Sequence, residues 1–235
     1  MRKRSLIIYV IVVVLCFGLP KAEAYIYFND GQTHNIDYIT TEGVFVRDDA
    51  SDNATTVNLL SGGEVRDLVP KDNSIITVSG GLIADSLVAE GNSNITFSSG
   101  SIGDKLYAFD SSNVIVSGGS IGDEINSYGG LITVSGGSIG TSLIAGLNCA
   151  DRGHLIIEGS NFAIDGVPVG YGELHSVLGD VWSMEPDRRL TGTLLSGDQI
   201  DNVFYINEGS SITLIPEPAT LLLLGLGAVM LRKKR

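Results

Sequence analysis

A four-residue unit, an apolar residue followed by Ser-Gly-Gly or a close variant, recurs through the middle of the chain. Its copies begin at Leu60, Val78, Phe97, Val116, Val134 and, in a weaker form, Ile157. The first five copies are 18 or 19 residues apart, and 23 residues precede the last. This period is too short for a pair of helices, and Gly, Ser, Ile and Val all disfavour helix. The repeat therefore restricts the chain to folds with one short β-rich coil per copy.

Two further apolar positions follow each copy in register. The first is occupied by Val65, Ile83, Ile102, Ile121 and Ile139, and the second by Val69, Leu87, Leu106, Ile125 and Leu143. Before each copy the chain alternates, as in Ile76-Thr77-Val78, which is typical of a half-buried strand. We therefore predict an all-β fold, a parallel β-solenoid (β-helix) of 18–19-residue coils, with apolar side chains stacked inside and Gly at the corners.

An acidic residue lies between the two apolar positions in four of the coils, at Asp67, Asp85, Asp104 and Asp123. Simple alternation would bury these carboxylates in a stack, at a prohibitive cost, so we expect a corner that turns them outward. Coils about 4.8 Å apart would then form a column of like charges, a candidate cation ladder. Capping by turn amides is favoured there over loosely bound calcium, and no other cofactor or metal site is expected.

The N-terminus has the three zones of a secretion signal. Arg2, Lys3 and Arg4 are basic, residues 6–19 are mainly apolar, and Ala22 and Ala24 place small residues where signal peptidase reads them. We expect a signal helix at residues 1–24, export through the Sec translocon, and cleavage after Ala24.

The C-terminus has three zones as well. Pro216, Glu217 and Pro218 precede an apolar stretch at 219–231, which we expect to be a membrane helix, and the chain ends with Arg232, Lys233, Lys234 and Arg235. The apolar helix would be about 20 Å long against a hydrocarbon core of about 30 Å. Basic residues are retained on the cytoplasmic side of a membrane, so this segment predicts a marginal, transient anchor in the inner membrane.

The C-terminal zones at 216–235, taken together and in this order, resemble the PEP-CTERM tail of exported proteins in Gram-negative bacteria. The resemblance implies a partner, the membrane protease exosortase, and cleavage near the motif. It further implies release or transfer to the cell surface or extracellular matrix. Similar tails also follow some ice-binding proteins, so the tail indicates destination and leaves activity open.

The segment between the two ends is strongly acidic. Residues 25–215 contain 7 Lys and Arg against 25 Asp and Glu, a net charge of −18, which excludes binding to nucleic acid or anionic lipid. One cysteine, Cys149, remains after signal cleavage, so no internal disulfide is expected. We divide the segment into an N-terminal β cap (25–57), solenoid repeats (58–159) and a C-terminal β cap or irregular coils (160–215).

The sequence contains few residues in the arrangements that a catalytic site needs. Polysaccharide lyases and hydrolases of this shape need clustered or paired carboxylates, whereas this column supplies one Asp per coil. The alternative of a polysaccharide-active enzyme would place its site in residues 160–215. That segment contains Glu173, His175, Asp180, Glu185, Asp187, Arg188 and Arg189. The three histidines, His34, His154 and His175, lack the spacing of metal ligands.

An ice- or glycan-binding module is the other alternative. Thr77, Thr96 and Thr133 occupy equivalent outward positions, but Ile115 interrupts them, so a flat Thr surface for ice is incomplete. Tyr107, Tyr128 and Trp182 are residues that stack on sugars, but the sequence does not place them in one register. We therefore expect a non-catalytic solenoid, structural or adhesive, with extracellular polysaccharide as a candidate partner.

Overall fold

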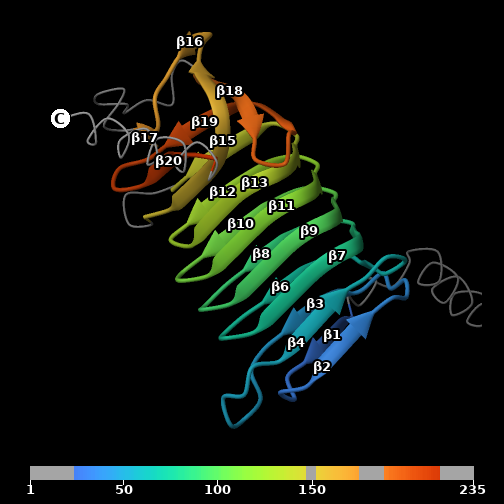
Figure 1. Ribbon diagram of the computed structural model, residues 1–235. Helices are drawn as coiled ribbons and strands as arrows, with labels where there is room; N and C mark the ends of the chain where they lie inside the picture. Colours follow the sequence, from blue (N-terminus) through green and yellow to red (C-terminus); the bar gives the residue numbers. More distant parts are fainter. Residues whose placement is uncertain (1–23, 147–151, 175–187, 218–235) are drawn as a thin grey trace, which may run out of the picture.

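The computed structural model describes residues 24–146, 152–174 and 188–217 as a stack of coils (Figure 1). Its named elements are all strands, joined by hydrogen bonds into one continuous sheet that winds through about seven turns. Successive coils pair parallel to one another through most of the stack. The prediction of an all-β, parallel β-solenoid is confirmed.

Each coil contributes to three faces. The first face stacks β2 (Thr33–Ile36), β4 (Thr56–Leu59), β7 (Ile75–Ile83), β9 (Asn94–Ile102), β11 (Asn113–Ile121), β13 (Leu131–Ile139), β15 (His154–Ile164) and β20 (Ser211–Pro216). The second face stacks β5 (Glu64–Val65) with the last residues of β7, β9, β11 and β13. The third face stacks β1 (Tyr25–Phe28), β3 (Gly43–Val46), β6 (Leu68–Pro70), β8 (Leu87–Ala89), β10 (Leu106–Phe109), β12 (Glu124–Tyr128), β14 (Ser142–Ala145) and β19 (Gln199–Ile206).

Inward side chains from the three faces form one apolar core that runs along the stack. Ile76, Ile95, Val114 and Ile132 lie on successive rungs of the first face and are at most 2% exposed. Because each inward residue packs against its equivalents in adjacent coils, burial of these side chains is the main stabilising contribution.

Glycine is required at the corners for two different reasons. In the Ser-Gly-Gly corner, Gly119 has φ +83°, and a Cβ there would lie 2.7 Å from Cε1 of Phe97. At the next corner, a Cβ on Gly122 would lie 2.1 Å from the carbonyl oxygen of Gly103. The repeated glycines therefore follow from left-handed backbone at one corner and from close contact between coils at the other.

One apolar position differs from the expectation. The structure aligns Leu68, rather than Val69, with Leu87, and Leu68 is fully buried while Val69 lies on the outer side of the strand. Only Arg66 and Asp67 separate Val65 from Leu68, whereas three residues separate Ile83 from Leu87. A corner shorter by one residue exchanges the inward and outward side chains, because sidedness alternates along a strand.

The two ends of the stack differ. Strands β1 to β4 already pair parallel with later coils, so the residues assigned to an N-terminal cap form the first rungs. At the other end, β15 continues into antiparallel pairing with β16 (Val167–Pro168) and β18 (Arg188–Leu194), and β17 (Gly172–Glu173) pairs antiparallel with β20. Residues 203–216 then rejoin the solenoid.

Several sequence expectations concern segments outside the described residues. These are the signal helix, with Ala22, and the membrane helix, with Pro218 and the basic end at 232–235. Cys149, His175, Asp180, Trp182, Glu185 and Asp187 also lie outside. Within the part of the chain that the structure describes, no helix has the length and apolar character needed to cross a membrane.

Candidate functional site

The Asp column lies at the corner between the second and third faces. The amide of Asp104 donates to the carbonyl of Asp85, and the amide of Asp123 donates to that of Asp104, each at 2.9 Å. These residues and Asp67 are half-buried or exposed, and none points into the core. The backbone ladder therefore holds the corner in register and directs the acidic side chains outward.

The column has cations at its two ends. Arg66 Nε lies 2.9 Å from Asp67 Oδ2, and Lys105 Nζ lies 3.6 Å from Asp123 Oδ2. Between them, no ion pair joins Asp85 or Asp104 to any cation in the described ranges. Partial burial, followed by repulsion from Asp67 and Asp104, raises the pKa of Asp85. The attraction of Arg66 opposes this shift without reversing it, so the middle of the column carries negative charge that is only partly compensated.

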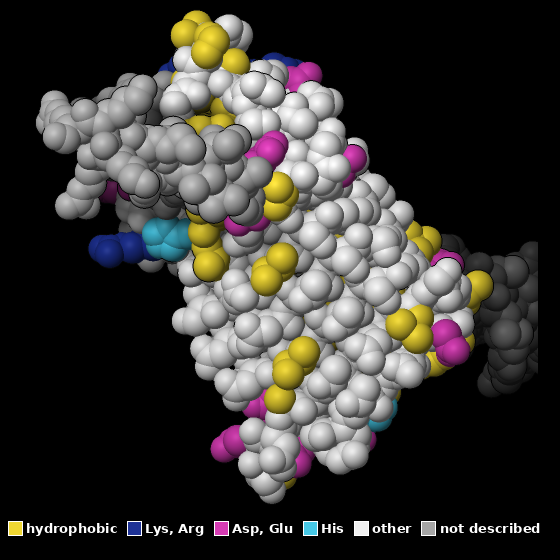
Figure 2. All heavy atoms as spheres, viewed as in Figure 1, with side chains coloured by type: hydrophobic (Ala, Val, Ile, Leu, Met, Phe, Trp, Pro, Cys, Tyr) yellow, Lys and Arg dark blue, Asp and Glu magenta, His cyan; other side chains and the backbone are white. Residues whose placement is uncertain are grey.

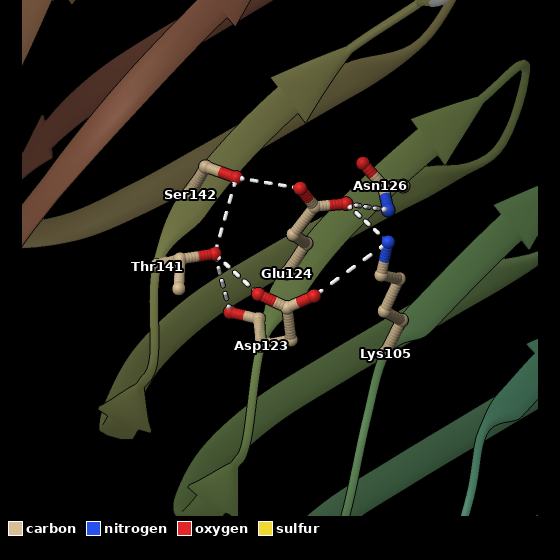
Figure 3. Close-up of polar contacts among 6 residues, drawn as sticks. All are labelled: Lys105, Asp123, Glu124, Asn126, Thr141 and Ser142. Atoms are coloured by element: carbon tan, nitrogen blue, oxygen red, sulfur yellow. Dashed lines mark hydrogen bonds and ion pairs between the residues drawn. The ribbon is translucent and has the colours of Figure 1, made fainter.

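Lys105 belongs to a polar network that spans three successive coils (Figure 3). Its Nζ lies 3.0 Å from Glu124 Oε2, and this hydrogen bond is the largest cause of the raised pKa of Lys105. The other oxygen of Glu124 accepts from the Ser142 hydroxyl at 3.2 Å. Asp123 Oδ1 accepts from the Thr141 hydroxyl at 2.6 Å.

The capping of the column therefore varies along its length. The Ser86 amide donates to Asp67 at a long 3.4 Å, whereas Asp123 is held by a hydroxyl and an ammonium group. Within the described part of the chain, no group of three or more His, Cys, Asp or Glu side chains is placed to hold a metal ion. Loosely bound calcium at Asp67, Asp85, Asp104 and Asp123 stays a prediction.

An aromatic cluster adjoins this network on the third face. The rings of Tyr107 and Phe109, both on β10, are 5.9 Å apart, and Tyr128 on β12 lies 6.0 Å from Tyr107 and 5.1 Å from Phe109. The alternate residues Leu106 and Ala108 are fully buried, so the rings point outward. Tyr107 and Tyr128 therefore lie close together. Phe109 is the register partner of Tyr128, and Tyr107 is the next outward residue on the same strand as Phe109. The 19-residue separation of Phe109 and Tyr128 was the signal that would have revealed this.

Asn126 lies on β12 in register between Tyr107 and Ile144, but it is buried rather than part of the exposed surface. It is only 1% exposed, its Nδ2 donates to Glu124 at 3.2 Å, and its Oδ1 has no hydrogen-bond partner. Burial is the main cause of the raised pKa of Tyr107, and the charges of Asp104, Glu124 and Asp123 also raise it. The acidic network and the aromatic cluster therefore form one continuous site.

The first face has a different character. Its strands β7, β9, β11 and β13 contain no Asp, Glu, Lys or Arg. Figure 2 shows much of the surface over the middle coils as white, with scattered hydrophobic side chains. Thr77 and Thr96 are register partners, and Ile115 separates them from Thr133, as expected. Over these four strands, the first face is an uncharged surface that carries hydroxyl and amide groups, with an interrupted Thr column.

The remaining candidates lie apart from this site. His34 contacts Asp30 at 2.8 Å near the first rung, and His154 contacts the Ser211 hydroxyl at 2.9 Å near the last. Among the described members of the alternative catalytic set, Arg188 pairs with Asp165, Arg189 pairs with Asp201, and Glu173 lies on β17. Both arginines therefore form ion pairs with surface carboxylates.

The fold defines a class of protein, a three-sided parallel β-solenoid with an acidic and aromatic site on its third face. Residues 214–235 match the family model described as the PEP-CTERM protein-sorting motif, which confirms the resemblance of the tail. The match begins within β20, on the last rung, where the Ser160 hydroxyl donates to Glu217 at 3.0 Å. Neither the curated proteins nor the solved structures contain a match to this chain.

Proposed function

We propose that this chain is a non-catalytic structural or adhesive protein of the cell surface or extracellular matrix, and that exosortase sorts it through its C-terminal tail. The observation that carries the proposal is the junction at residues 214–217, where the sorting motif begins inside the last rung. Because no linker separates motif and solenoid, the entire stack stays close to the membrane until processing.

The arrangement of polar groups supports a scaffold rather than an enzyme. General acid–base catalysis needs two groups that converge on one bond. Here the Asp residues are one coil apart, and Asp123 and Glu124 are already bonded to Lys105, Thr141 and Ser142. A glycan-binding role is the second candidate, favoured by the outward cluster of Tyr107, Phe109 and Tyr128.

The test is fractionation of cells that express the full chain, with intact-mass measurement of the exported protein. We expect a mature protein that begins at Tyr25 after signal peptidase cleavage and lacks Arg232 to Arg235. A chain without residues 216–235 should be released into the periplasm after signal cleavage, since it has no anchor that holds it at the inner membrane. Exported protein that retains the basic end would refute exosortase processing.

The enzyme alternative is tested on the same material. Reducing-end and unsaturated-product assays over neutral and acidic glycans should stay at background. Reproducible turnover of a glycan that is lost in Glu173→Gln would refute the non-catalytic role and indicate an enzyme.

A further inference from the structure

The third face combines two features that together favour a ligand with an apolar face and a positive charge. The rings of Tyr107, Phe109 and Tyr128 present outward aromatic surface. Asp85 and Asp104 on the adjoining corner are outward carboxylates without a described ion-pair partner. We propose that this site binds an extracellular polysaccharide that contains amino sugars with free, protonated amines.

Aromatic side chains favour a sugar as the ligand. Saccharide rings have apolar faces that pack on Tyr and Phe rings, while their hydroxyls need hydrogen-bond partners at the rim. The rim here contains Glu124, Thr141 and Ser142, which carry acceptor and donor oxygens within one network.

The charge of the site selects among sugars. Asp85, Asp104, Asp123 and Glu124 outnumber the two cations described beside them, Arg66 and Lys105, so the surface next to the rings is negative. This charge repels uronic-acid and sulfated polymers, and it attracts an ammonium group, which also binds favourably over aromatic faces. The repulsion among Asp67, Asp85 and Asp104 decreases when a ligand cation lies beside them.

The geometry of the stack favours a polymer over a single sugar. The site extends over the coils that contain β8, β10, β12 and β14, and adjacent coils repeat about every 4.8 Å. Several successive sugar units can therefore contact equivalent positions along the corner. This inference deepens the proposed adhesive function, because it names the partner of the solenoid outside the cell.

The test is calorimetric titration of the full-length protein at pH 5.5 with a hexamer of β-1,4-linked glucosamine. The N-acetylated hexamer and an oligogalacturonate serve as comparison ligands. We expect saturable binding of the glucosamine hexamer, at least ten-fold weaker binding of the N-acetylated hexamer, and no binding of the polyanion. Equal binding of both hexamers would overturn the role of the ammonium group, and absence of saturable binding would overturn the site.

Variants locate the binding on the third face. Tyr107→Ala and Tyr128→Ala should each raise Kd about ten-fold, and Tyr107→Phe should leave it within about two-fold, because it preserves the ring. Asp104→Asn should weaken binding and reduce its dependence on salt. The control Tyr27→Ala alters the same face at the far end of the stack and should leave Kd unchanged. If Tyr107→Ala binds normally, the inferred site is wrong.

Failure of this inference and failure of the proposed function give different results. If the glucosamine hexamer does not bind but the mature protein still reaches the surface without its basic end, the sorted scaffold stands and the ligand is wrong. If the hexamer binds but the tail is never processed, the site stands and the sorting is wrong.

Discussion

At the residue scale, Gly119 shows how strictly one coil is matched to the next. Its positive φ turns the chain between the first and second faces, and a Cβ at this position would lie 2.7 Å from the ring of Phe97 in the preceding coil. The backbone angle and the contact act independently, so a side chain at this position is disfavoured twice.

We expect Gly119→Ala to lower the free energy of unfolding by about 1–3 kcal/mol, because both the φ of +83° and the 2.7 Å approach to Phe97 must be accommodated. Urea denaturation followed by circular dichroism measures the change. Gly170→Ala is the matched control, since a Cβ at Gly170 meets no atom within 4 Å. Equal stability of the two variants would contradict the structural role of the corner.

The environment of Asp85 predicts that the stability of the protein depends on pH. The pKa of Asp85 is raised in the folded state, mainly by burial and then by Asp67 and Asp104, so the folded protein holds this proton more tightly than the unfolded chain. Its contribution to stability is therefore present at low pH and is lost as the pH rises through the raised pKa. Asp85→Asn should stabilise the protein at pH 7, with little effect at pH 3. Thermal melts of this variant and of the surface control Glu208→Gln measure the effect. The change in Tm relative to the unmodified protein should differ between the two variants at pH 7 and should be similar at pH 3.

The contact between Ser160 and Glu217 predicts an effect on the rate at which the tail is processed. The Ser160 hydroxyl donates to Glu217 within the motif, and Gly159 pairs with Pro216 beside it. Because a protease needs an extended, accessible segment, release of the motif from this rung must precede recognition. Ser160→Ala should accelerate loss of the tail in a pulse-chase experiment, while Ser196→Ala, a change in the β18–β19 turn, should not. Slower processing of Ser160→Ala would show that the contact assists recognition instead.

At the element scale, neighbouring strands depend on each other for hydrogen bonds and for covered apolar surface. Strand β11 has β9 on one side and β13 on the other, whereas β1 pairs with β3 alone among the described strands. Strand β15 has two roles, since it first continues the parallel stack and then pairs antiparallel with β18. Local stability therefore varies along the solenoid.

Hydrogen exchange measures this variation. We expect amides of β9 and β11 to be protected close to the global free energy of unfolding, and those of β1 and β2 to exchange much faster through local opening of the first rung. Mass spectrometry after timed exchange resolves these segments. Uniform protection along the stack would show that the solenoid unfolds as one cooperative unit.

At the scale of the whole molecule, the dominant property is negative charge. The chain has a formal net charge of −12, and four of its acidic residues form a single column. Like charges at this density destabilise the compact state, and salt screens them.

Sodium chloride at about 0.5 M should therefore raise Tm by a few degrees. Calcium and magnesium at millimolar concentration and equal ionic strength should act alike, because no described group of carboxylates forms a chelating set. Thermal melts in the three salts measure the difference. A large increase with calcium alone would assign the column of Asp67, Asp85, Asp104 and Asp123 as a specific calcium ladder.

The sequence by itself determined the features that depend on one coil or on one terminus. The 18–19-residue period, the inward apolar positions other than Val69, the corner glycines and the outward Asp column could be predicted, because each coil repeats the same local requirements. The sorting motif was readable for a different reason, since its zones are contiguous in the chain.

Only the tertiary structure decided the contacts between coils. The length of a single corner placed Leu68 rather than Val69 inside, and the register between β10 and β12 brought Tyr107, Phe109 and Tyr128 together. The return of residues 203–216 to the stack depended on antiparallel pairing of β18, which interrupts the period. Side chains 18 or 19 residues apart become neighbours only when backbone hydrogen bonds set the register, and a one-residue difference in a corner changes which of them meet.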